Sequence, residues 1–247
     1  MYFKEQLKKG FFSVEFAFVV LITIITLGIP GEEAIVYDDD FLTIFISIQG
    51  NSIIALIFPM LVCLPLAIKY VSEYNSGYFS LIAMKMSVRK YTWVKLVCNG
   101  IVGGTAIAFP TMLYIIRLIY AKGFNVGLAK EATWPISILP QVYEESPLLY
   151  GIILIVGVFI TGATFATIGL GIAATFKKSY LVLLIPLAYY ILSAIVFAGN
   201  LRYFDATSLY VLNSHFNNNL LLSFVYAMML FAIGTTMFVQ GVKKNVM

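Results

Sequence analysis

Stretches of about twenty predominantly apolar residues follow one another along this 247-residue chain. Hydrophobic residues make up 61% of the sequence and charged residues only 11%, whereas the charged share of a soluble globular domain is typically about 25%. A helix of about 20 apolar residues can cross the hydrocarbon of a bilayer, because it pairs its backbone polar groups internally. The sequence therefore predicts an all-α, polytopic membrane protein.

Six such runs can be bounded, and they predict a single transmembrane domain over residues 1–247. Polar, charged or helix-breaking residues separate one run from the next. The predicted spans are approximately residues 11–29, 50–70, 91–120, 148–176, 180–198 and 220–242.

Prolines predict where these spans end or bend, because proline removes a backbone donor and clashes with the preceding turn. Pro30 is expected to end the first span, and Pro59 and Pro65 to bend the second. Pro110 is expected to interrupt the third. Small residues in spans three and four predict close helix packing: Gly100, Gly103, Gly104, Gly157, Gly162, Ala163, Ala166, Gly169, Gly171 and Ala173.

The basic residues set the expected orientation. Twelve of the sixteen Lys and Arg residues lie in segments that the six-span topology places on one side, and nine of the twelve acidic residues lie on the other. Lys and Arg accumulate on the cytoplasmic side of membrane proteins. We therefore expect a multi-pass protein of the cell membrane with both termini in the cytoplasm.

Isolated polar residues carry less information. Glu15 either pairs with a nearby Lys at the membrane surface or links the basic N-terminal lead to the cytoplasmic segment described below. Arg117 is expected to extend to the headgroups, with a substrate contact as the alternative. Cys63 and Cys98 are expected to fill space in the spans, with a mutual contact as the alternative. The aspartates at 38–40 predict a solvated helix start and no metal site.

Residues 71–96, which read VSEYNSGYFSLIAMKMSVRKYTWVKL, lie between spans two and three on the predicted cytoplasmic side. Short polar side chains predict a helix start near Gly77, and an apolar helix over about residues 77–86 follows. This helix is too short to cross a membrane. It either docks on another protein or lies as an amphipathic loop on the headgroups.

The segment resembles the coupling segment in permease subunits of bacterial type-2 ABC exporters. The matching residues are Glu73, Gly77, the apolar Leu81, Ile82 and Ala83, the break at Ser87, and the basic pair Arg89 and Lys90. Two features depart from the family pattern. Tyr78 stands where Thr is usual, and no proline precedes the basic pair.

The resemblance implies that this helix binds a cytosolic ABC ATPase subunit and that a second permease half, identical or different, completes the transporter. It further implies export of a hydrophobic or amphipathic substrate, as in antimicrobial peptide export or self-protection, with lipid or glycan export as the alternative. The implied partner-binding residues are Glu73, Gly77, Tyr78, Leu81, Ile82, Met84, Lys85, Arg89 and Lys90.

The sequence offers no chemistry of its own for catalysis. It contains no Gly-Lys pair, so a Walker-type phosphate loop is absent, and it has a single histidine. We therefore expect a non-enzymatic transport subunit without a cofactor, with ATP and Mg²⁺ on the partner ATPase and with no nucleic-acid partner. An ion-driven secondary transporter and a membrane scaffold remain alternatives.

Overall fold

The protein is helical throughout the part of the chain that the structure describes. The computed structural model describes residues 2–37, 40–77, 86–124, 126–127, 136, 138–197, 204–211 and 219–246, and no strand occurs among them. The all-α prediction is thereby confirmed. The helices are α1 (Tyr2–Phe11), α2 (Val14–Tyr37), α3 (Phe41–Asn51), α4 (Ile54–Leu61), α5 (Ala67–Asn75), α7 (Val88–Lys122), α8 (Pro140–Glu145), α9 (Pro147–Phe176), α10 (Ser179–Val196), α11 (Thr207–Tyr210) and α12 (Leu220–Val246).

Four of these helices, α7, α9, α10 and α12, are each long and apolar enough to cross a membrane. Two pairs of consecutive helices meet the same criterion only when each pair is taken together. The bend is 44° between α1 and α2 and 69° between α3 and α4. The described residues therefore contain four to six candidate spans, which is the organisation of a multi-pass membrane protein.

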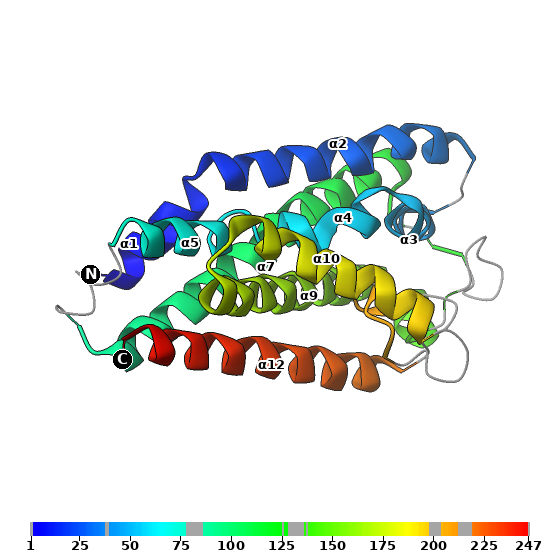
Figure 1. Ribbon diagram of the computed structural model, residues 1–247. Helices are drawn as coiled ribbons and strands as arrows, with labels where there is room; N and C mark the ends of the chain where they lie inside the picture. The colour runs from blue at the N-terminus through cyan, green and yellow to red at the C-terminus, as the bar shows by residue number, and fades with distance from the viewer. Residues whose placement is uncertain are drawn as a thin grey trace.

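The long helices run along a common direction, and both termini lie at the same end of the bundle (Figure 1). We call this end the termini end and the opposite end the far end. Helices α1 and α5 lie at the termini end, whereas α3 lies at the far end (Figure 1). In the view of Figure 1, α9 and α10 run between α2 and α12.

The first predicted span differs from the structure at both of its ends. Helix α2 begins at Val14 and continues through Pro30 to Tyr37, so the prediction that Pro30 ends the helix is wrong. A proline within a helix removes one backbone hydrogen bond, because it has no N–H group to donate to the carbonyl of the preceding turn. Membrane helices tolerate this loss. The basic lead forms a helix of its own, α1, and its direction differs from that of α2.

The second predicted span, residues 50–70, is not one continuous helix. Its polypeptide is divided among α3, α4 and α5, with a 69° bend where Ser52 and Ile53 separate α3 from α4. Pro59 lies inside α4, so it does not mark the bend that was predicted for it. Pro65 lies in the turn between α4 and α5, as its missing backbone donor favours.

The third predicted span is longer and more regular than expected. Helix α7 extends over 35 residues and passes through Pro110 without interruption, which corrects the predicted break. The remaining helices α9, α10 and α12 lie within a few residues of the ranges 148–176, 180–198 and 220–242.

Glycines bring α9 into close contact with the helices on both of its sides. A Cβ atom placed on Gly162 of α9 would lie 3.0 Å from the carbonyl oxygen of Gly103 on α7. On the other side, a Cβ on Gly171 would lie 2.7 Å from the carbonyl oxygen of Gly234 on α12. Helices in membranes associate through such close approach, since lipid provides no hydrophobic drive between them.

Aromatic side chains fill the space that the broken second span leaves near the middle of the bundle. The Phe58 ring of α4 packs edge-on against Phe165 of α9 and Tyr190 of α10, with centroids 5.2 and 5.0 Å away. It stacks on Tyr210 of α11 at 4.5 Å. All four side chains are buried. This cluster joins four helices, each from a different part of the sequence.

Candidate functional site

The predicted coupling segment lies between two helix ends that the structure describes. Helix α5 ends at Asn75, and Gly77 follows with a φ of +73°, a left-handed conformation that glycine adopts without strain at the end of a helix. Helix α7 begins at Val88. Gly77 therefore terminates the preceding helix, and the helix predicted over about residues 77–86 stays a prediction. Residues 78–85 lie outside the described part of the chain.

A buried ion pair joins these two helix ends. The Nζ atom of Lys95 on α7 lies 2.6 Å from Oε2 of Glu73 on α5. Only 3% of the Lys95 side chain and 16% of the Glu73 side chain are exposed. In such surroundings a single charge is costly and the pairing is strongly favoured over separation. The pair therefore fixes the distance between the end of α5 and the first turns of α7.

Two further contacts hold α5 against the bundle. The Lys177 ammonium, in the turn between α9 and α10, donates a hydrogen bond to the Tyr74 hydroxyl at 2.6 Å and lies 4.2 Å from the centre of the Tyr74 ring. Lys69 pairs with Glu15 of α2 at 2.9 Å near the surface. Successive turns of α5 are thus tied to three neighbouring elements.

Helix α5 also packs against the bundle through apolar contacts. Tyr70 and Val71 are buried, and the Tyr70 ring packs edge-on against Phe238 of α12 at 5.4 Å. Helix α5 therefore combines buried apolar side chains with paired polar side chains. Helix α5 is thus in contact with α2, α7, α9 and α12.

The predicted site residues have different positions. Glu73 and Gly77 belong to the end of α5, and Arg89 and Lys90 are exposed in the first turn of α7. These four residues flank the same gap in the described chain. Five predicted residues lie outside the described part: Tyr78, Leu81, Ile82, Met84 and Lys85.

The sequence analysis did not foresee the partner of Glu73. The Lys95 side chain is buried about two turns into α7. Glu73 and Lys95 lie 22 residues apart on different helices, so only the folded arrangement shows the pair. Glu15 does pair with a Lys, and that Lys belongs to α5.

A second polar cluster, at the start of α3, pairs a carboxylate with helix amides. Asp40 accepts hydrogen bonds from the amides of Leu42 and Thr43, and the Tyr143 hydroxyl of α8 donates to it at 2.7 Å. Burial raises the pKa of Tyr143 above its ordinary value, so the hydroxyl remains a donor. The predicted helix start is therefore present, but Asp40 is buried and not solvated as expected.

Helix α11 is a short element between the predicted spans 180–198 and 220–242. Its last carbonyl groups have no partners within so short a helix. Thr161 of α9 donates to the carbonyl of Leu209 at 2.7 Å, and Gln49 of α3 donates to that of Tyr210 at 2.9 Å. These bonds allow the backbone of α11 to be buried between α3 and α9.

The remaining reactive side chains form no catalytic constellation within the described residues. Among them, no group of three or more His, Cys, Asp and Glu side chains is placed to hold a metal ion. Cys63 and Cys98 are both free and buried. The Cys63 thiol lies 3.1 Å from the carbonyl oxygen of Pro59 and the Cys98 thiol 3.7 Å from that of Phe3. The two cysteines occupy separate packing sites.

Comparison with protein families, curated proteins and solved structures identifies no match for this chain.

The two ion pairs of α5 predict different responses to the same substitution. Glu73→Gln leaves the Lys95 charge buried without its partner, and we expect the free energy of unfolding to fall by about 3–5 kcal/mol. Glu15→Gln removes a solvent-exposed pair, whose loss typically costs about 0–1 kcal/mol. Thermal unfolding of the purified variants in one detergent measures the difference. Equal unfolding temperatures for the two variants would contradict the assigned role of the Glu73–Lys95 pair.

Proposed function

We propose that this protein is the permease subunit of an ATP-driven exporter of the type-2 ABC class. In this proposal the bent pairs α1–α2 and α3–α4 each form one span, so that six spans cross the cell membrane. The termini end faces the cytoplasm. This orientation is supported by the position of both termini at one end (Figure 1) and by the excess of Lys and Arg in the segments assigned to that side.

The observation that carries the proposal is the anchoring of the segment at 78–85. Before this segment, Lys69, Glu73 and Tyr74 hold α5 against the bundle. After it, Lys95 holds α7 to α5. A segment that receives force from a separate protein must pass that force to the transmembrane helices. The buried Glu73–Lys95 pair and the apolar contact of Tyr70 with α12 supply this connection.

Partner subunits supply what the chain itself lacks. ATP and Mg²⁺ bind to cytosolic ABC ATPase subunits, and the apolar residues around Leu81 and Ile82 dock into them. A second permease half, identical or different, completes the path for the substrate. The substrate is hydrophobic or amphipathic, in keeping with the apolar spans, and an antimicrobial peptide fits the resemblance.

The distribution of carboxylates favours this proposal over an ion-driven transporter. Ion-coupled transporters commonly place acidic side chains at mid-membrane depth. In α2, α7, α9, α10 and α12 the middle turns contain no Asp or Glu. The buried Asn99 of α7 adds a carboxamide that the sequence analysis did not weigh, but this group carries no charge.

The orientation can be tested with an impermeant thiol reagent on intact cells. The variants place single cysteines at the exposed Glu145 and Lys178 in a background where Cys63 and Cys98 are changed to Ala. We expect Glu145→Cys to react from outside and Lys178→Cys to react only after the cells are opened. The reverse pattern would show that the termini end faces outward.

The docking of residues 78–85 can be tested with Ile82→Asp and Ile82→Leu. A carboxylate buried in a protein contact typically costs several kcal/mol, and each 1.4 kcal/mol lowers association about tenfold. We expect Ile82→Asp to lose a copurifying ATPase with a Walker motif and to abolish export, and Ile82→Leu to retain both. Normal recovery of the ATPase and normal export with Ile82→Asp would refute the coupling role and favour a segment lying on the headgroups.

A further inference from the structure

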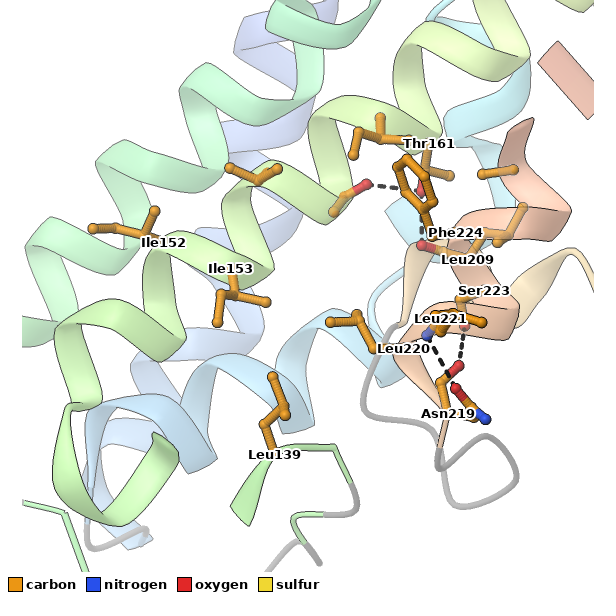
Figure 2. A pocket seen from close by; sticks show the side chains of 14 residues that line it. Leu139, Ile152, Ile153, Thr161, Leu209, Asn219, Leu220, Leu221, Ser223 and Phe224 are labelled. Carbon is orange, nitrogen blue, oxygen red and sulfur yellow. Dashed lines mark hydrogen bonds between the residues drawn. The ribbon is translucent and has the colours of Figure 1, made fainter. Parts of the chain in front are cut away.

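A cavity of about 750 Å³ lies between α9 and α12 toward the far end of the bundle. Figure 2 shows it between the side chains of Ile152 and Ile153 on α9 and those of Leu220, Leu221 and Phe224 on α12. Its volume is within the range of small-molecule sites, about 300–1,000 Å³. The part of the cavity wall that α12 forms begins at Leu220, the first residue of that helix.

The cavity exists because α9 and α12 are in close contact over only part of their length. A Cβ on Gly234 of α12 would lie 2.8 Å from the Ile168 amide nitrogen, and one on Gly241 would lie 2.8 Å from the Cβ of Ala174. The cavity lies further toward the far end, along residues 152–161 of α9 and 220–227 of α12. There α9 also meets α11 through the bond between Thr161 and Leu209.

The polar groups that line the cavity are used within the protein. The Thr161 hydroxyl donates to the carbonyls of Gly157 and Leu209 at 2.9 and 2.7 Å. The Asn219 side-chain oxygen accepts from the amides of Leu221 and Leu222. The Ser223 hydroxyl donates to the Asn219 carbonyl at 3.5 Å. Among the described residues that line the cavity none is charged, so its interior suits a purely apolar occupant.

The walls of the cavity continue onto the outer apolar surface of the bundle. Ile152, Leu221 and Phe224 line the cavity, and they are 55%, 68% and 51% exposed. In a multi-pass membrane protein, such an apolar outer surface is in contact with lipid. An occupant can therefore enter sideways from the bilayer without crossing water.

We propose that this cavity binds one acyl chain of a membrane phospholipid. A hydrocarbon chain needs no hydrogen-bond partner, whereas the amide groups of an extended peptide would remain unpaired at a cost. A helix from a second copy of the chain, about 10–12 Å wide, would fill such a volume within roughly one to two turns. A single acyl chain follows the walls of both helices. This site does not depend on whether the protein is coupled to an ATPase.

The test uses the full-length protein in vesicles of phosphatidylethanolamine and phosphatidylglycerol, with a phosphatidylglycerol probe that carries a photoreactive diazirine on one acyl chain. We expect labelling of residues 152–161 and 220–227 to saturate at a low mole fraction of probe. Ile153→Trp and Leu220→Trp fill the cavity from opposite walls and should each lower this labelling about tenfold, because every excluded methylene group weakens binding. Val225→Trp, on the exposed outer side of α12, is the matched control and should leave labelling unchanged.

Thermal unfolding shows whether Ile153→Trp and Leu220→Trp are folded. Because the two substitutions lie on different helices, either folded variant is enough for the test. Labelling that rises in proportion to the probe, with equal labelling of the filled and control variants, would show ordinary contact with bulk lipid and overturn the proposal. Displacement of the probe by an apolar peptide but not by unlabelled phosphatidylglycerol would assign the cavity to a peptide. A disulfide between two copies of Leu221→Cys that abolishes labelling would assign it to a dimer contact. Both of these results also overturn the proposal.

Discussion

The structure depends on the close approach of α9 to its two neighbours. Lipid surrounds helices with an environment as apolar as their own surfaces, so packing must replace the hydrophobic effect that drives association in water. Gly162 provides the contact with α7, and Gly171 provides the contact with α12. These contacts place α9 at the centre and decide where other elements can fit. The broken second span, with its Phe58 cluster, and the short helix α11 occupy the remaining space.

This packing produces two different ends. At the termini end, α5 is held by an apolar contact with Phe238 and by the pairs of Lys69, Glu73 and Tyr74. Toward the far end, α9 and α12 enclose an apolar cavity. In the proposed function, the first end passes movement from a cytosolic partner into the helices. The far end is suited to holding a hydrocarbon chain. Substitutions can change the contacts of α5 and the cavity independently.

The sequence predicts the long helices well because length and apolar composition alone determine them. It predicts Pro30 and Pro110 poorly, since neighbouring helices make a proline acceptable within a long apolar helix. The burial of α11 depends on Thr161 and Gln49, which are 48 and 161 residues from the carbonyls they bind. No local pattern encodes such pairs. The same reason explains why Lys95 was missed as the partner of Glu73.

We propose that the Glu73–Lys95 pair connects the segment at 78–85 to the bundle and thereby to an ATPase. Exchange of the two charges tests it most directly, because the pair can form in either direction. Recovery of the Walker-motif ATPase is measured for Glu73→Lys, for Lys95→Glu and for the double variant, each normalised to folded chain. The account predicts that each single variant loses the ATPase and that the double variant regains it. Full recovery with both single variants, or loss that the double variant does not repair, would contradict the account.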